Sequence, residues 1–299
     1  MSKGYDVKDG ITICICTFRR ESLFETIVSL FSLQREGLPP LSILIADNDE
    51  HDGLRGTVED FAAQAPIPVR YVHAPFRNIS IARNACLETA DTRWAAFIDD
   101  DEVAKPDWLQ TLYRHAPGNN AVIGDSVAVY GSDLPGWLAK ADFHSNRITG
   151  QVENAYTSNA LLDLDFVHAN ALRFRKTLGQ TGGEDTIFFK QFALAGGKIV
   201  YVPKAVVFET VTPGRATMKW VLKRAFRSGQ THGELCRDFM PPKMAALPLT
   251  SSAKSGFSAV MALATIPGTA RSRRWLARSV FHAGALSYSF RRTILKEYG

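Results

Sequence analysis

The first hundred residues alternate short, almost continuously apolar runs with longer amphipathic segments. The apolar runs cover residues 11–16, 41–46, 69–72 and 94–98, and the amphipathic segments that follow them cover residues 21–34, 53–63, 80–89 and 106–115. Strands that helices cover on both faces are apolar along their whole length. The alternation therefore predicts an α/β fold with a Rossmann-like, mostly parallel sheet flanked by helices.

The second half of the chain is less regular. Residues 131–157 are rich in Gly, Ser, Asp and Asn and predict a long loop over a site. Further strands are predicted over residues 161–167, 198–202 and 205–211, a helix over 184–194, and helical candidates over 218–227, 257–266 and 271–295. Prolines separate the last three, and no strand pattern follows Pro213 and Gly214. We therefore predict a domain over residues 1–215 and a C-terminal helical extension over residues 216–299.

Four consecutive acids, Asp99, Asp100, Asp101 and Glu102, follow the predicted strand 94–98. Ligands of parallel sheets gather at the carboxyl ends of the strands, where Thr17 and Asp47 also lie. Acids packed so closely raise one another's pKa and attract a cation. Oxygen ligands at alternate positions suit Mg²⁺ or Mn²⁺, especially an ion shared with substrate phosphates. A solvated acidic turn is the alternative.

Composition and cysteine usage narrow the class of protein. With 299 residues and 45% hydrophobic content, the chain is long enough for one large domain or a domain with an extension. Its four cysteines, Cys14, Cys16, Cys86 and Cys236, show neither metal-binding nor disulfide spacing, so we expect buried, reduced thiols. The chain opens without an apolar leader and has no run of eighteen apolar residues, which predicts a cytoplasmic location.

Five motifs stand in an order that resembles the family 2 inverting glycosyltransferases with the GT-A fold, especially bacterial exopolysaccharide enzymes of the succinoglycan type. They are Ile-Cys-Ile-Cys-Thr-Phe-Arg-Arg at 13–20, Leu-Ile-Ala-Asp-Asn at 44–48, Ile-Ser-Ile-Ala-Arg-Asn at 79–84, the acidic run, and Thr-Gly-Gly-Glu-Asp-Thr at 181–186. The resemblance covers about residues 11–230. It implies a nucleotide-sugar half over about 1–103 and an acceptor half over about 104–215.

The resemblance also implies roles at the donor site. Asp101 and Asp99 would hold Mn²⁺ or Mg²⁺, with Asp100 in support and Glu102 solvated. Glu209 stands where many relatives have a metal-binding histidine, so its part in the metal shell is in doubt. Thr17 and Asp47 would contact the base, and a carboxylate facing the uracil N3 proton favours a UDP-sugar; an Asx turn is the other interpretation of Asp47.

Four more residues would contact the donor. Arg83 would pair with the pyrophosphate or with the acidic run, although it is also readable as a surface arginine. Arg19 and Arg20 are weaker candidates of the same kind. Asn159 matches a family position near the donor sugar, and an ordinary asparagine at a strand start is the alternative.

The family's catalytic acidic pair corresponds to Glu184 and Asp185. Inversion needs a general base on the acceptor hydroxyl. We assign the base to Asp185, with Glu184 binding the acceptor or positioning its partner, while Gly182 and Gly183 let the backbone approach the sugar. Acids are also favoured in the first turn of any helix, which is the competing explanation.

The C-terminal segment is basic and amphipathic. Leu276, Val280, Ala283, Phe290 and Ile294 recur at helical spacing, flanked by basic residues. Such a helix can lie on a membrane surface, or it can pack on the catalytic domain with a solvated basic face. The resemblance favours the membrane and a saccharide acceptor linked to polyprenyl diphosphate, with Trp220, Arg224 and Arg227 near it.

Two other functions are compatible with parts of the sequence. Asp99 and Asp101 also fit the nucleophile motif of haloacid-dehalogenase-like phosphatases, in which the first Asp attacks phosphorus. That motif normally lies on the first strand, whereas about ninety residues precede it here. A nucleic-acid or membrane-binding module would use the basic tail but leave the acidic run unexplained, so we expect no nucleic-acid partner.

Overall fold

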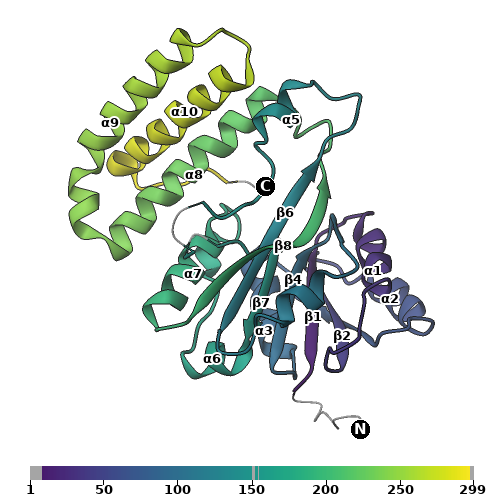
Figure 1. Ribbon diagram of the computed structural model, residues 1–299. Helices are drawn as coiled ribbons and strands as arrows, with labels where there is room; N and C mark the ends of the chain where they lie inside the picture. Colours follow the sequence, from purple (N-terminus) through teal and green to yellow (C-terminus); the bar gives the residue numbers. More distant parts are fainter. Residues whose placement is uncertain (1–8, 150–151, 154, 297–299) are drawn as a thin grey trace.

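The computed structural model describes residues 9–149, 152–153 and 155–296 and has one eight-stranded sheet (Figure 1). In spatial order the strands are β3 (Val69–His73), β2 (Leu41–Asp47), β1 (Ile11–Thr17), β4 (Trp94–Asp99), β7 (Asn159–Asp163), β6 (Ala121–Val129), β8 (Ile199–Thr210) and β5 (Glu102–Ala104). The first four are parallel, β7 is antiparallel to both neighbours, and β6 pairs with β8 in parallel. The predicted α/β class is confirmed.

Helices cover both faces of the sheet, as the apolar strands predict. The helices α1 (Leu23–Phe31), α2 (Arg55–Ala62) and α4 (Trp108–Tyr113) pack on the face that receives Ile13 and Ile15. The helices α3 (Ile79–Thr89), α6 (Leu164–Ala169) and α7 (Glu184–Leu194) pack on the opposite face. Successive side chains of a strand point to opposite faces, so Cys14 joins this second core. At their carboxyl ends, β1, β2 and β4 finish in the polar residues Thr17, Asp47 and Asp99, which belong to neither core.

Several predicted elements differ from the structure. Residues 161–167 form the end of β7 followed by α6, because the Asp163 side chain accepts a hydrogen bond from the Asp165 N–H and starts a helix. The two strands predicted over 198–202 and 205–211 are one strand, β8. Its pairing with β6 shifts register opposite residues 202–205, where Pro203 needs no ladder hydrogen bond.

The remaining differences in the α/β region concern the predicted loop over residues 131–157 and two strands, β5 and β6, that were not predicted. The described residues between 131 and 157 contain one short helix, α5 (Trp137–Ala141), and residues 150, 151 and 154 of the predicted loop lie outside the described part of the chain. The strands β5 and β6 have no clear strand pattern in the sequence, because β5 has three residues and the apolar run of β6 is interrupted by Gly124, Asp125 and Ser126. All four cysteines are free thiols, and Cys14, Cys86 and Cys236 are buried, as predicted.

The chain ends in three long helices, α8 (Met218–Phe239), α9 (Pro241–Ala264) and α10 (Ala270–Arg291), which form a layer beside the sheet (Figure 1). The predicted break at Pro248 is wrong, because Pro248 lies inside α9. The predicted domain boundary near residue 215 falls between β8 and α8, and the division into two domains stays a prediction. Across the described part of the chain, no helix has the length and apolar character needed to span a bilayer.

Glycines allow α8 and α10 to cross in close contact. A Cβ on Gly229 would lie 1.9 Å from the Phe281 carbonyl oxygen, and one on Gly284 would lie 1.9 Å from the Phe226 carbonyl oxygen. Both obstacles are backbone atoms, which cannot rotate away. The contact between these helices therefore requires residues without a side chain at both positions.

We expect Gly284→Ala to lower the free energy of unfolding by ~1–3 kcal/mol, because the added methyl group forces α8 and α10 apart. Gly256→Ala, in α9, is the matched control, since a Cβ there meets nothing within 4 Å. Chemical denaturation of both variants measures the difference. Equal stability of the two variants would contradict the close crossing.

Candidate active site

A pocket of about 1020 Å³ opens at the carboxyl ends of β1 and β4 and extends to α7 and α8. Of the site residues predicted from the sequence, the pocket wall contains Thr17, Arg19, Arg83, Asp99, Asp100, Asp101, Gly183, Glu184, Asp185, Glu209, Trp220, Arg224 and Arg227. Asp47 and Asn159 are not in the wall. Segments far apart in sequence thus converge on one cavity.

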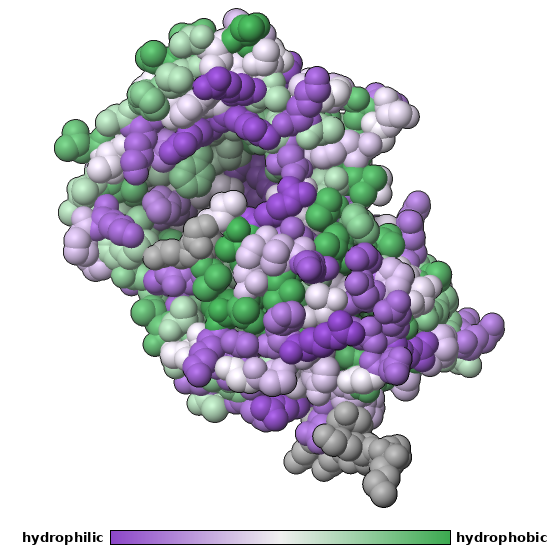
Figure 2. Space-filling model, viewed as in Figure 1, coloured by the Kyte–Doolittle hydropathy of each residue, from purple (hydrophilic) through white to green (hydrophobic). Residues whose placement is uncertain are grey.

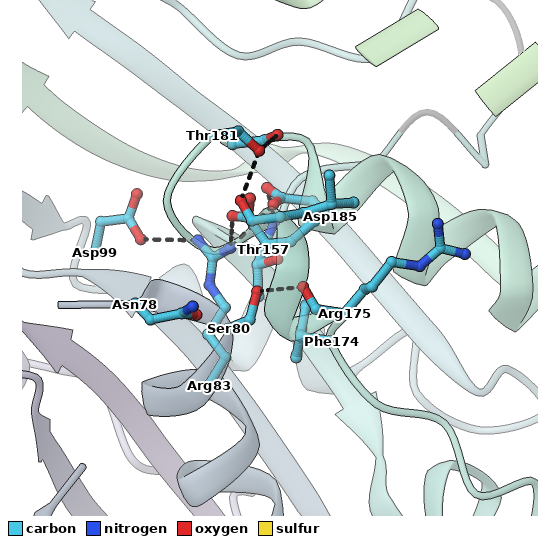
Figure 3. A network of polar contacts seen from close by, with 12 residues as sticks. Asn78, Ser80, Arg83, Asp99, Thr157, Phe174, Arg175, Thr181 and Asp185 are labelled. Carbon is cyan, nitrogen blue, oxygen red and sulfur yellow. Dashed lines mark hydrogen bonds and ion pairs between the residues drawn. The ribbon is translucent and has the colours of Figure 1, made fainter. Parts of the chain in front are cut away.

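The guanidinium of Arg83 joins the two acidic groups of this pocket (Figure 3). Its Nη1 contacts the carboxylates of Glu184 and Asp185, the latter at 2.9 Å, and its Nη2 lies 3.8 Å from Asp99 Oδ1. Arg83 is buried on α3, over the ring of Phe174. Of the interpretations of Arg83, the structure contains the ion pair with the acidic run, not a surface arginine. Arg83 also contacts Glu184 and Asp185, and the sequence did not predict this pairing.

Glu184 and Asp185 occupy the first turn of α7, and their pKa values are shifted in opposite directions. Burial, with the adjacent Asp185 charge, raises the pKa of Glu184 to about 8. Burial also acts to raise the pKa of Asp185, but Arg83 and a hydrogen bond from the Thr157 N–H outweigh it, so this pKa is lowered. Within the pair, Glu184 therefore favours its protonated form and Asp185 its ionised form.

The turn before α7 needs glycine. Gly182 and Gly183 have φ angles of 76° and 93°, in the left-handed region that side chains disfavour. A Cβ on Gly183 would also lie 2.3 Å from Thr231 of α8. The two glycines therefore bring the start of α7 against α8 and hold Glu184 and Asp185 at the pocket wall.

Three acids of the run, Asp99, Asp100 and Asp101, line the pocket, and the fourth, Glu102, does not. Thr17 Oγ1 donates to Asp100 Oδ2 at 2.7 Å, and Arg20 lies 3.6 Å from Asp101. Burial raises the pKa of Asp100 to about 6, against the Thr17 hydrogen bond. The prediction that Glu102 is solvated is wrong: it is buried and accepts hydrogen bonds from the Asp99 N–H and Ser126.

Asp99 and Asp101 fit a divalent cation that substrate phosphates share. Desolvation, with repulsion from Asp101 and Asp100, raises the pKa of Asp99 to about 7 although Arg83 acts to lower it. A cation beside these carboxylates would relieve that repulsion, and Mg²⁺ commonly uses one or two carboxylates plus phosphate oxygens. Among the described residues, no three His, Cys, Asp or Glu side chains form a complete metal shell.

Glu209 does not fit as a further metal ligand. Its carboxylate is bonded to Arg215, whose Nη1 also lies 3.6 Å from Asp101. A cation next to Glu209 would have to displace this guanidinium, so we correct the assignment of Glu209 to the metal. We had not predicted a role for Arg215. Its signal in the sequence is a lone arginine directly after Pro213 and Gly214, where the last strand ends near Glu209.

Asp47 and Asn159 serve the fold instead of the donor. Asp47 accepts hydrogen bonds from Tyr71 OH and the Asp49 N–H, which is the Asx turn left open as its alternative. Asn159 is 1% exposed. Its amide donates to the Asp125 and Ala205 carbonyls and accepts from Trp108 Nε1. Neither side chain faces the pocket, so both assignments to the donor are corrected.

The outer end of the pocket is basic and aromatic. Trp220, at the start of α8, stacks on His144 with ring centres 4.9 Å apart, and the guanidinium groups of Arg215 and Arg224 lie over its ring. Arg227, further along α8, donates to the Thr181 carbonyl. Arg19, which also lines the pocket, forms a double hydrogen bond with Asp49. The pocket wall therefore contains several guanidinium groups besides its acids.

Comparison with solved structures gives the same fold at low sequence identity. A mannosyltransferase of Pyrobaculum calidifontis, solved with GDP-Man and Mn²⁺, is 18% identical, with a TM-score of 0.64 over 97% of this chain and 91% of that one. TarS 1-349 of S. aureus, solved with UDP-GlcNAc, is 14% identical, with a TM-score of 0.54 over 93% of this chain and 91% of that one.

Sequence comparison identifies the family. The succinoglycan biosynthesis protein ExoM of Rhizobium meliloti (strain 1021) is 40% identical over 295 residues, which are 97% of this chain and 96% of the relative. A glucosyl-dolichyl phosphate glucuronosyltransferase of Haloferax volcanii is 26% identical over 73% of this chain and 75% of its own length. The model of glycosyl transferase family 2 matches residues 12–181. The chain therefore belongs to glycosyl transferase family 2 and is a glycosyltransferase.

Proposed function

We propose that this glycosyltransferase is metal-dependent and inverting, and that it moves glucose from a UDP-sugar to a saccharide on polyprenyl diphosphate during exopolysaccharide assembly. The observation that carries the proposal is the Arg83 network, which places the carboxylates expected on the donor side and those expected on the acceptor side within one pocket. The 40% identity to a succinoglycan biosynthesis protein supports the exopolysaccharide acceptor.

The proposed reaction is a single displacement. The acceptor oxygen bonds to the anomeric carbon while the bond from that carbon to the diphosphate breaks, and the electron pair leaves with UDP. Asp185, ionised and in the pocket wall, accepts the hydroxyl proton. Glu184 Oε2 has no hydrogen-bond partner among the described residues, and a protonated Glu184 is proposed to donate to the acceptor that enters the pocket.

The donor diphosphate is proposed to lie against Asp99, Asp101 and Arg20. A Mn²⁺ or Mg²⁺ ion held by Asp99 and Asp101 would supply positive charge to the departing diphosphate. Thr17 fixes Asp100 beneath them through its hydrogen bond. With Asp47 occupied by Tyr71 and the turn, the preference for uracil rests on the resemblance to bacterial enzymes and on the TarS complex with UDP-GlcNAc.

The acceptor is proposed to enter from the α8 side. Arg224 and Arg227 lie one turn apart on this helix and line the pocket beside Trp220. Two guanidinium groups suit a diphosphate, and Trp220, stacked on His144, lies beneath the Arg224 guanidinium. An acceptor of this kind is held in a membrane, so the enzyme is proposed to work at the inner face of the plasma membrane, with the C-terminal helices in contact with lipid.

The phosphatase alternative is not supported. Asp99 ends the fourth strand in sequence and not the first, and its nearest cation is the Arg83 guanidinium. The family match and the relatives are those of glycosyltransferases.

The donor assignment predicts metal-dependent thermal protection. UDP-glucose with Mn²⁺ should raise the Tm in thermal-shift measurements, whereas UDP-glucose with EDTA should not, because the diphosphate then meets uncompensated carboxylates. The same measurement with GDP-mannose tests whether the donor nucleotide carries guanine instead of uracil. Asp101→Asn should lose the protection, and Asp91→Asn, which breaks an exposed ion pair with Arg70, should keep it. Equal protection in EDTA would refute the metal assignment.

The base assignment predicts a separation of binding from transfer. Asp185→Asn should keep nucleotide-dependent protection and lose roughly 10²–10⁴-fold in transfer rate, the usual contribution of a general base. Asp165→Asn is the matched control, because Asp165 also lies in the first turn of a helix but is exposed to solvent. Initial rates with a lipid-linked acceptor measure the effect, and full activity of Asp185→Asn would remove it as the base.

The raised pKa of Glu184 predicts a pH-dependent stability difference. Between its ordinary pKa of 4.5 and about 8, the folded state holds a proton that the unfolded state has released, so Glu184 makes the protein less stable as pH rises. Glu184→Gln removes this contribution. Relative to the wild type, its free energy of unfolding should increase by up to ~1.4 kcal/mol per pH unit across this window.

Denaturation at pH 5, 6, 7 and 8 measures that slope. Glu88→Gln, which removes an exposed carboxylate of α3, should show none. A difference between Glu184→Gln and the wild type that is constant with pH would mean that Glu184 is already ionised at neutral pH.

A further inference from the structure

The helices α9 and α10 carry positive charge and contain no acids. No Asp or Glu occurs between Phe239 and Lys296, whereas nine basic residues do: Lys243, Lys254, Arg271, Arg273, Arg274, Arg278, Arg291, Arg292 and Lys296. An uninterrupted basic segment favours an anionic partner. Its charge alone does not say which face meets that partner.

The predicted apolar stripe of α10 does not form a continuous surface that could meet an anionic partner. The helix lies against α8 and α9, with the small residues Ala277, Gly284 and Ala285 buried. Ile294 packs beside Leu178, Ile187 and Leu235. Leu276 and Phe290 remain exposed, but Val280 and Ala283 between them are partly covered. The prediction that this stripe lies on a membrane is therefore corrected.

The solvent-facing side of α9 is apolar instead. Leu249, Phe257, Val260 and Leu263 are 78%, 60%, 63% and 81% exposed. Ala253 and Gly256, also exposed, lie between them on the same side of the helix. The only charged residues of α9 are Lys243 and Lys254. An ordinary surface helix exposes polar residues, whereas the centre of the exposed side of α9 is apolar.

Cations and aromatic rings border the apolar side of α9. A hollow between α9 and α10 is lined by Ala253, Lys254, Phe257, Ser258 and Arg278. Trp275 packs edge-on against Phe257, and the Arg278 guanidinium lies over the Trp275 ring. Figure 2 shows hydrophobic and hydrophilic side chains side by side along the outer edge of the molecule, over the C-terminal helices. Tryptophan and basic side chains are typical of the headgroup layer of a bilayer.

We propose that α9 lies in the headgroup layer of an anionic phospholipid membrane. Leu249, Phe257, Val260 and Leu263 face the acyl chains. Lys254 and Arg278, in the hollow beside them, bind lipid phosphates. Charge selects this partner over an apolar protein groove, because the whole surrounding segment is basic.

This membrane contact rests on the proposed function, in which the acceptor is linked to a membrane lipid. The helix α8, which packs against α10, carries Trp220, Arg224 and Arg227 in the wall of the pocket. One helical layer therefore holds both the membrane-facing side and the acceptor end of the pocket. An acceptor diphosphate anchored in the bilayer would stay close to the membrane-bound enzyme.

Flotation of the full-length protein with vesicles tests the proposal without any transfer reaction. The wild type should float with phosphatidylcholine vesicles that contain phosphatidylglycerol and bind pure phosphatidylcholine weakly. The triple variant L249E/V260E/L263E should lose binding by roughly tenfold or more, because three carboxylates would enter the headgroup layer. Leu194→Glu, at an exposed apolar position of α7, is the matched control and should bind as the wild type does.

A second pair of substitutions tests the lipid phosphates. Lys254→Gln with Arg278→Gln should reduce binding to phosphatidylglycerol vesicles towards the level on pure phosphatidylcholine. Every variant should retain the Tm and the nucleotide-dependent protection of the wild type, which shows that the fold and the donor site are intact. Loss of nucleotide protection in the wild type would refute the proposed donor and leave vesicle binding to be judged separately.

Two outcomes would overturn the proposal. The first is that the wild type does not float with anionic vesicles, or that the triple variant floats equally well. The second is that size-exclusion chromatography with light scattering shows a wild-type dimer and a monomeric triple variant, while vesicle binding is unchanged. The apolar side of α9 would then join two copies of the chain.

Discussion

One buried guanidinium connects the parts of this enzyme. Arg83 reaches Asp99 at the end of β4 and Glu184 and Asp185 at the start of α7, so three elements depend on a single cation. Removing one partner of a buried ion pair typically costs ~3–5 kcal/mol, because the other charge is left uncompensated. The same cation lowers the pKa of Asp185, while burial and the Asp185 charge raise the pKa of Glu184. Stability and the proposed proton transfer thus share one interaction.

The glycines at 182 and 183 give this network its geometry. Their left-handed backbone turns the chain sharply before α7, and Gly183 lies directly against Thr231. The first turn of α7 is consequently fixed between α3 and α8. The pocket is lined on one side by the parallel strands and on the other by a helix of the C-terminal layer, so the two parts of the chain separated by residue 215 both contribute to it.

The sequence predicts those parts of the structure that depend on local pattern. The alternation of apolar and amphipathic segments identifies the strands and helices of the first hundred residues, and the order of the motifs identifies the acids of the pocket. The directions of single side chains depend on partners distant in sequence. Asp47 turns to Tyr71 and Asn159 to Trp108, and neither contact leaves a signal in the neighbouring residues. The apolar, solvent-facing side of α9 was not predicted, because Pro248 indicated a break within the segment that forms this helix.

Arg215 supplies positive charge from within the chain. Its guanidinium lies between Asp101 and Glu209 and balances carboxylates at the open end of the sheet. In small zinc domains the ion is needed for the chain to adopt its shape at all. Here a guanidinium of the chain itself pairs with Asp101 and Glu209, so neither carboxylate depends on an added ion for a positively charged partner in the folded chain.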